Sequence, residues 1–250
     1  MEHPIGVDGI ARTRVLDLPV DDVPEQCIAD ALSNMLSDGE THHIVLLSLW
    51  DFMRARRDAE LRKLVANASL VIPTTVGLVR GAAFLRQGSP TRYTHFDFVV
   101  RLLGALEQSG GTLYLVGGSR DELRIVEGNI RQTFPGVRLV GRYFGDYPRP
   151  METDIVTAIR KAAPDVLFAG PRLAGGEKWL WRRRSSFAPG VSIFSDECYE
   201  VFAERRRRPT RSATKQALLR ALRVLWHPWR VLSLFVYGWY WVRLFFRRLR

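Results

Sequence analysis

Cysteine is scarce in this chain, with only Cys27 and Cys198 among 250 residues. Two cysteines without a C-x-x-C spacing exclude a disulfide framework and favour a reducing, cytosolic setting. The five histidines do not lie near cysteines or carboxylates at the spacings of metal ligands, so no metal site is expected. His42 and His43 are adjacent in a predicted strand and point to opposite faces, which favours structural roles over a ligand pair.

Acidic residues are absent after Glu204, whereas 13 lysines and arginines follow it. The preceding 204 residues hold the other 24 basic residues against 26 acidic ones, so their net charge is close to zero. The basic character of the chain therefore belongs to its C-terminal part and indicates an anionic partner for that part. The polar first residues contain no apolar run, and no secretory signal is expected.

Long apolar runs are also absent. The longest uncharged stretch of the C-terminal part is residues 231–242, which spans roughly 18 Å as a helix against the roughly 30 Å of a bilayer core. Helices are predicted over 213–226 and from Pro228 to the C-terminus, and an interfacial helix pair is favoured over a short insertion, a nucleic-acid arm or a protein-binding segment. The residues expected to meet the membrane or acceptor phosphates are Arg230, Trp239, Trp241, Arg243, Arg247 and Arg248.

Short apolar runs alternate with segments of helical periodicity between residues 40 and 200. Strands are predicted at 44–49, 70–72, 112–116, 137–140, 165–169 and 191–194. Helices are predicted at 58–68, 98–106, 121–134 and 153–163. This alternation predicts an α/β fold, a Rossmann-like and mostly parallel sheet with helices on both faces, plus a helical C-terminal appendage. The expected division is an N-terminal segment 1–40, an α/β core 41–204 and a basic, aromatic-rich tail 205–250.

Glycines follow two of the predicted strands, at the edge where ligands of open α/β sheets bind. Gly117 and Gly118 precede Ser119, a candidate helix cap, and Gly170 follows a later strand. A phosphate-binding turn and a plain tight turn fit these glycines equally well, because no G-x-G-x-x-G or P-loop pattern is present.

Several segments together resemble one known family. Residues 113–118 (LYLVGG) look like its strand-turn "vfllGG", and residues 134–145 are similar to its "yPglkivG…GyF" stretch. Residues 159–170 resemble "I..a.PDil.vglG", residues 177–180 resemble the end of "PkQEkWi", and Asp97 falls on the acid of "R.tG.D". In order and spacing the chain resembles the WecG/TagA/CpsF glycosyltransferases.

This resemblance implies transfer of an N-acetylmannosamine-type sugar from a UDP-sugar donor to a polyprenyl-diphosphate-linked acceptor. The reaction would belong to cell-envelope polysaccharide synthesis at the cytoplasmic face of the membrane. It implies a peripheral protein that self-associates and needs no cofactor, the UDP-sugar being a substrate. No nucleic-acid partner is expected, because residues 231–242 are more apolar than a nucleic-acid arm requires. The nucleotide-sugar site is expected at Gly117, Gly118, Tyr143, Gly145, Gly170 and Glu177.

The chain departs from the family pattern at the residue expected to act as the catalytic base. Thr74 stands in place of the proposed catalytic aspartate, and a neutral hydroxyl cannot by itself take the proton from an acceptor. Either another carboxylate serves, with Asp97 the leading candidate and Asp146 a weaker one, or the chain is an inactive sugar-nucleotide-binding or scaffold protein. Asp97 also fits a helix N-cap, and Glu177 also fits the first turn of a helix.

Overall fold

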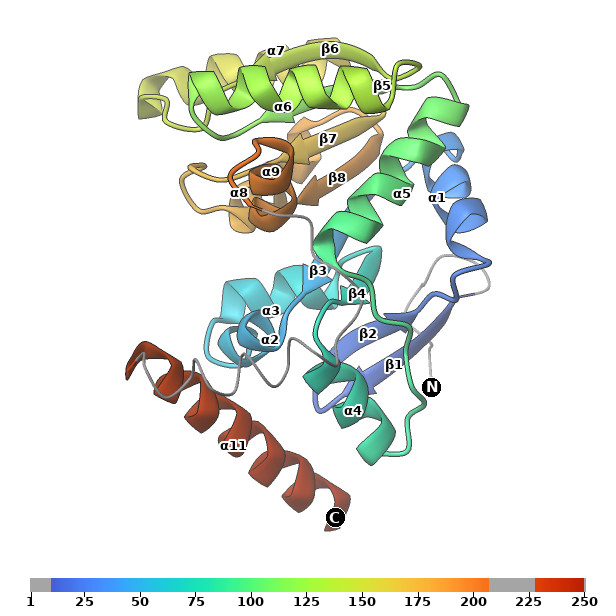
Figure 1. Cartoon of the computed structure of the whole chain (residues 1–250), viewed down its shortest axis with the longest axis vertical. Coiled ribbons are helices and arrows are strands. Elements are labelled where there is room, and N and C mark those ends of the chain that lie inside the picture. The colour runs from blue at the N-terminus through green and yellow to red at the C-terminus, as the bar shows by residue number, and fades with distance from the viewer. Residues whose placement is uncertain (1–9, 207–227, 250) are drawn as a thin grey trace.

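The computed structural model describes residues 10–206 and 228–249. Its centre is a six-stranded parallel sheet in the order β4-β3-β8-β7-β5-β6 (Figure 1). The strands are β3 (Thr41–Leu47), β4 (Leu70–Pro73), β5 (Thr112–Val116), β6 (Arg138–Tyr143), β7 (Val166–Ala169) and β8 (Gly190–Phe194). The expected Rossmann-like α/β fold with a parallel sheet is confirmed.

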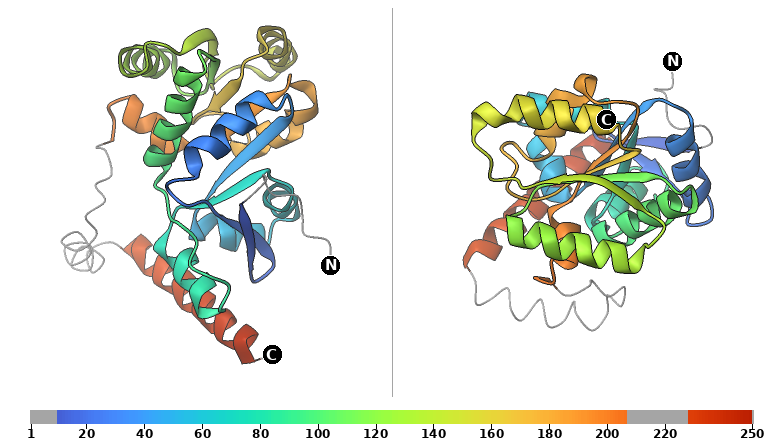
Figure 2. Two further views of the ribbon diagram at one scale, coloured as in Figure 1. Left: turned by 90° about the vertical axis from the view of Figure 1, so that its right-hand side faces the viewer. Right: turned by 90° about the horizontal axis from the view of Figure 1, so that it is seen from above.

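Helices cover both faces of the sheet because successive strand residues point to opposite sides. In β3, Ile44 and Leu46 pack into one core, and Val45 and Leu47 into another. The first face carries α1 (Ile28–Ser37), α5 (His95–Gln108), α6 (Arg120–Thr133) and α9 (Asp196–Phe202). The second carries α2 (Leu49–Ala55), α3 (Ala59–Ala66), α4 (Val76–Phe84), α7 (Glu152–Ala162) and α8 (Glu177–Arg183), as the views in Figure 2 show.

The six expected strands are all present, and their ends differ in two informative places. The run predicted at 44–49 ends as a strand at Leu47, because Ser48 caps α2 and its Oγ accepts the backbone N–H of Asp51 at 3.1 Å. The strand predicted at 137–140 extends to Tyr143 at the sheet edge, where exposed and half-buried residues alternate. The four predicted helices correspond to α3, α5, α6 and α7.

A hairpin that the sequence analysis did not anticipate extends the second face. It consists of β1 (Ala11–Val15) and β2 (Leu18–Asp22). Arg12 forms a salt bridge with the fully buried Asp21 at 2.6 Å, and Asp21 also accepts the backbone N–H of Val71 in β4 at 2.7 Å. A buried carboxylate needs such partners, so these bonds fix the hairpin beside β4.

The C-terminal helix α11 (Pro228–Leu249) begins at Pro228, as predicted. It lies along α4 and α2 (Figure 2), and its Tyr240 and Leu244 side chains are buried. The Tyr240 ring meets Phe52 edge-on at 5.8 Å, and its hydroxyl donates to the Gly77 carbonyl at 3.3 Å. In the described ranges we find no helix with the length and apolar character needed to cross a bilayer. The helix predicted at 213–226 falls outside the described residues.

Candidate active site at the carboxyl edge of the sheet

The carboxyl ends of the parallel strands meet at one edge of the sheet, where α/β proteins bind ligands. Three helices begin there directly after a strand, with Ser48, Ser119 and Ser195 as N-caps of α2, α6 and α9. Ser119 is confirmed as a cap and forms a capping box with Glu122. Helix N-termini carry partial positive charge, so this edge suits an anionic ligand.

The glycines predicted for nucleotide binding lie together where the loops after β5, β6 and β7 meet. Their backbone N–H groups bind neighbouring loops: Gly117 donates to the Tyr143 carbonyl at 2.9 Å, and Gly145 donates to the Gly118 carbonyl at 2.8 Å. The other two donate to Pro171 and Val116, at 2.7 Å for Gly118 and 2.8 Å for Gly170. These N–H groups hold the loops together, so a ligand above them would bind side chains and the first turn of α6.

Tyr199 of α9 fills the space beneath the glycine loops. Its buried hydroxyl donates to the Gly117 carbonyl at 2.8 Å. A Cβ at Gly118 would approach the Tyr199 ring to 2.7 Å, and a Cβ at Gly170 would come closer still. Gly118 also has a φ of +65°, which favours glycine. The two glycines are therefore required for packing against Tyr199.

Charged side chains surround the start of α6. Arg172 binds Asp146 at 2.8 Å and lies 3.4 Å from Glu122. The guanidinium of Arg120 stacks over the Phe144 ring at 4.6 Å. Asp146, the weaker base candidate, is thus an ion-pair partner of Arg172, whose charge Asp146 and Glu122 balance, and Arg120 adds positive charge beside the helix N-terminus.

A second group of side chains lies near the ends of β3 and β8. Burial, followed by the charges of Asp51 and Asp196, raises the pKa of Glu177 to about 8. Burial, followed by the charges of Glu200 and Asp51, raises the pKa of Asp196 to about 6. Glu177 is the first residue of α8, as one of the two readings of the sequence proposed. At neutral pH it is an uncharged acid that can donate a hydrogen bond.

His43 faces Glu177 from within β3. Its Nδ1 lies 3.0 Å from the Ser192 Oγ, and the Ser192 hydroxyl donates to the His42 carbonyl. Nδ1 must therefore donate, which leaves a lone pair on Nε2, 3.9 Å from the Glu177 Oε1. Burial, with the nearby charge of Arg184, lowers the pKa of His43 to about 4. His43 is a neutral, structural residue, and in the described ranges no three His, Cys, Asp or Glu side chains are grouped to hold a metal.

Thr74 stands in place of the family's catalytic aspartate, and Asp97 is the leading candidate for another catalytic carboxylate. Thr74 is buried and its hydroxyl donates to the Leu47 carbonyl at 3.1 Å. Asp97 lies in the first turn of α5, but the cap is Thr94, whose Oγ1 accepts the Asp97 N–H at 3.1 Å. The N-cap reading of Asp97 is therefore wrong, and its catalytic role stays a prediction.

The residues that join these strand ends were not among the predicted site residues. His95 begins α5 and its Nδ1 lies 3.0 Å from the Ser195 Oγ at the end of β8. Asp51 and Asp196 occupy the first turns of α2 and α9. A sequence signal was available, because each follows a serine or threonine that can cap a helix, and Asp51 and Asp196 also follow apolar runs that end in serine.

Five of the six residues predicted for membrane contact lie in the part of α11 whose side chains are described. Trp239, Trp241 and the three arginines at 243, 247 and 248 are exposed, with Arg243 stacked over Trp239 at 5.2 Å. Phe245 and Phe246 are also exposed, by 55% and 64%. The side chain of Arg230 lies outside the described part. Exposed aromatic and basic side chains thus lie together on α11, and two of them, Trp241 and Arg248, also contact Phe84 at the end of α4.

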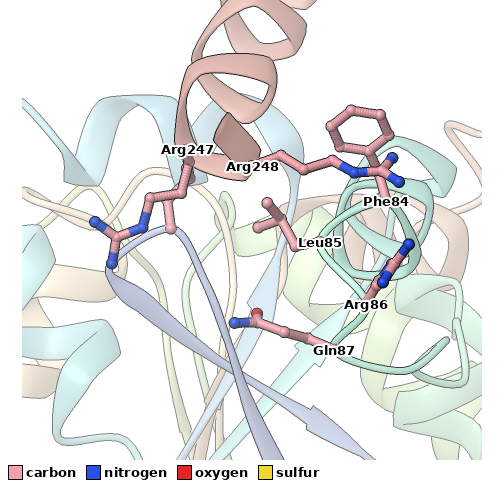
Figure 3. Close-up of a pocket in the computed structure, with 7 residues that line it drawn as sticks. Phe84, Leu85, Arg86, Gln87, Arg247 and Arg248 are labelled. Atoms are coloured by element: carbon pink, nitrogen blue, oxygen red, sulfur yellow. The ribbon is translucent and has the colours of Figure 1, made fainter. Parts of the chain in front are cut away.

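A pocket of about 430 Å³ lies between the ends of α4 and α11 (Figure 3). Three guanidinium groups and one amide surround it, and none of its lining residues is acidic: Leu16, Phe84, Leu85, Arg86, Gln87, Arg247 and Arg248. The Arg248 guanidinium stacks over the Phe84 ring at 4.6 Å. This pocket has the charge to receive an anionic group.

Comparisons with known proteins show which family this chain belongs to. One relative, N-acetylglucosaminyldiphosphoundecaprenol N-acetyl-beta-D-mannosaminyltransferase of Bacillus subtilis, is 23% identical over 176 residues, which are 70% of this chain and 68% of that protein. The protein of the same name from Staphylococcus aureus is 20% identical over 146 residues, 58% of this chain and 57% of that protein. The profile of the glycosyl transferase WecG/TagA/CpsF family matches residues 13–250. The chain therefore belongs to the WecG/TagA/CpsF family of glycosyl transferases.

Proposed function

We propose that this chain is a membrane-peripheral, inverting glycosyltransferase of cell-envelope polysaccharide synthesis. It would move a sugar from a UDP-N-acetylhexosamine-like donor to a polyprenyl-diphosphate-linked acceptor. The observation that carries the proposal is the family match along residues 13–250, with relatives named for N-acetylmannosamine transfer to N-acetylglucosaminyldiphosphoundecaprenol.

The donor would lie across the carboxyl edge, above the loops that contain Gly117, Gly118, Tyr143, Gly145 and Gly170. Support comes from the start of α6, where backbone N–H groups and the Arg120 side chain favour a diphosphate. Glu177 also suits an anionic donor, because its uncharged carboxyl can donate to a phosphate or sugar oxygen. No further cofactor is part of this proposal.

The acceptor would be reached from the cytoplasmic face of the membrane, on which α11 would lie. The exposed Trp239, Trp241, Phe245 and Phe246 would enter the interface, and arginines would meet lipid or acceptor phosphates. The pocket with Arg86, shown in Figure 3, offers such phosphates a preformed basic site. The contacts of Tyr240 with α2 and α4 would hold the membrane-facing helix near the ends of β3 and β4.

An inactive, sugar-nucleotide-binding or scaffold protein is the second candidate. The observation in its favour is Thr74, whose hydroxyl is buried and already bound to the Leu47 carbonyl. Such a protein would bind UDP-sugars at the same edge and transfer nothing.

Two measurements on the full chain test the proposal. Isothermal titration should show UDP and UDP-N-acetylmannosamine binding, with no binding by an unrelated nucleotide-free sugar. Incubation with UDP-N-acetylmannosamine and an N-acetylglucosaminyl-diphosphate prenol in detergent should release UDP and lengthen the acceptor by one sugar. Binding without transfer would favour the scaffold, and no UDP binding at millimolar concentration would contradict both candidates.

A further inference from the structure

His95 is placed across the carboxyl ends of three neighbouring strands. Just before it, the backbone N–H of Tyr93 donates to the Pro73 carbonyl at 3.3 Å, which holds this segment against the end of β4. Its Nδ1 lies 3.0 Å from the Ser195 Oγ, at the end of β8. Strand β3 lies between β4 and β8 in the sheet. The imidazole therefore lies at the carboxyl end of β8, between the ends of β3 and β4 and the loops above which the donor is proposed to bind.

Burial keeps the His95 ring uncharged, whereas two nearby carboxylates can stabilise its protonated form. Burial lowers the pKa of His95, and the carboxylates of Glu197 in α9 and Asp51 in α2 oppose this shift only in part. The charge of Arg206 lowers the pKa further. A neutral imidazole can accept a proton at neutral pH, and the two nearby carboxylates would face the imidazolium that results.

The hydrogen bond to Ser195 is compatible with the tautomer in which Nε2 can react. In the described part of the chain the imidazole makes one hydrogen bond, through Nδ1. The Ser195 Oγ accepts the Cys198 N–H at 3.2 Å and has a second lone pair for the Nδ1 proton. In that tautomer Nε2 carries the free lone pair, as in other sites where a hydroxyl or carbonyl orients a basic histidine.

We propose that His95 is the general base of the transfer reaction and that Ser195 is its positioning residue. This inference rests on the proposed function. The acceptor hydroxyl gives its proton to Nε2 while its oxygen forms the new bond to the anomeric carbon of the donor sugar. The bond from that carbon to the phosphate oxygen breaks, and UDP leaves with the electron pair. The proton later passes from the imidazolium to water.

Glu177, Thr74 and Asp51 are less suited to this step. Glu177 holds a proton at neutral pH, since its pKa is about 8, and Thr74 is bound to the sheet. Asp51 accepts a hydrogen bond from the Ser48 hydroxyl at 2.5 Å and lies 3.3 Å from Arg54. These contacts stabilise its charged form and make it a weaker base. His95 would take the role of the family aspartate whose position Thr74 occupies.

The test compares His95→Gln with His42→Gln, a control at a half-buried histidine bound to Asp38 at the opposite end of β3. Transfer is measured with UDP-N-acetylmannosamine and the N-acetylglucosaminyl-diphosphate prenol, and UDP affinity is measured by titration. His95→Gln should lower kcat about 100-fold or more and leave UDP affinity within about twofold of wild type, since a general base contributes about 10²–10⁴-fold. Ser195→Ala should lower kcat less and shift the acid limb of the pH profile, and His42→Gln should change neither.

The wild-type pH profile gives a readout that needs no variant. The kcat of the wild type should fall at acid pH with an apparent pKa below 6.5, because protonated His95 cannot act as a base. A wild-type profile without this limb, or full kcat in His95→Gln, would overturn the inference and leave the proposed function intact. Loss of activity in Asp97→Asn with full activity in His95→Gln would assign the base to Asp97. A wild type that binds UDP but transfers nothing would overturn both the inference and the proposed transfer.

Discussion

The ring of Tyr240 occupies the space above Gly81 in which any larger residue would place its Cβ. Leu244 lies over the same glycine, at 3.3 Å from that position. The contact joins α11 to α4 across 159 residues of sequence and depends on the absence of one side chain. Because α4 follows β4 directly, the helix that carries the exposed aromatic residues is packed beside the candidate active site.

Gly81→Ala should therefore displace α11 while α4 itself remains helical. Alanine has the higher helix propensity, so any loss comes from the clash with the Tyr240 hydroxyl. Hydrogen exchange should become faster in residues 76–84 and 238–249. Gly104→Ala is the matched control, because the space around Gly104 in α5 is open. Unchanged exchange in Gly81→Ala would contradict the docking of α11.

Tyr199→Phe should destabilise the fold by about 1–3 kcal/mol, because the buried Gly117 carbonyl loses its hydrogen-bond donor. Urea unfolding measures the change in the free energy of unfolding. Tyr147→Phe provides the comparison, since the buried Tyr147 hydroxyl has no partner in the described residues and its removal should cost little. Equal losses in both variants would argue against the role of Tyr199 in holding the loops.

Because of Glu177, the free energy of unfolding should fall as pH rises between about 4.5 and 8. Its pKa is about 8 when folded against an ordinary value of 4.5, so the folded state binds one more proton than the unfolded state in this window. The stabilising effect of protonation is complete below 4.5 and is lost as pH rises through 8. Glu177→Gln should remove this contribution from the Tm profile, and the exposed Glu40→Gln should not. A Tm profile unaffected by Glu177→Gln would show that Glu177 titrates normally.

Replacing both Phe245 and Phe246 by serine should weaken binding to vesicles of phosphatidylglycerol at least tenfold. Each exposed phenylalanine that enters the interface contributes about 1.5–3 kcal/mol. Flotation of the full chain measures the effect, and Ile125→Ser, at an exposed apolar residue of α6, is the control. Arg86→Ala should reduce binding to the same vesicles but leave binding to neutral vesicles unchanged, because it removes one charge from the basic pocket.

The strands and the longer helices could be predicted because their patterns are local. Residues 112–116 form a continuous apolar run because β5 has neighbours on both sides and is covered on both faces, and the predicted bounds agree with the structure. Helices α2, α8 and α9 have seven residues each, too few for their periodicity to stand out. The hairpin at 11–22 depends on the buried bond between Arg12 and Asp21, which no local pattern predicts.

Only those parts of the candidate site could be predicted in which the site residues follow their own strand in a turn. The glycine loops follow their own strands, so their place at the carboxyl edge could be inferred. The contact between His95 and Ser195 joins residues 100 positions apart, and that between His43 and Ser192 joins residues 149 apart. Both depend on β8 lying between β3 and β7, and strand order is not encoded in the periodicity of any one segment.

The strand order also has a consequence for biosynthesis. During translation, β4 and β3 can pair early, and β5, β6 and β7 can pair later, but these two half-sheets have no common edge until β8 joins them. The nascent chain must therefore keep the facing edges of β3 and β7 unpaired until residue 194 has left the ribosome. A chain terminated before Gly190 would consist of two half-sheets with an open gap, and we expect it to aggregate.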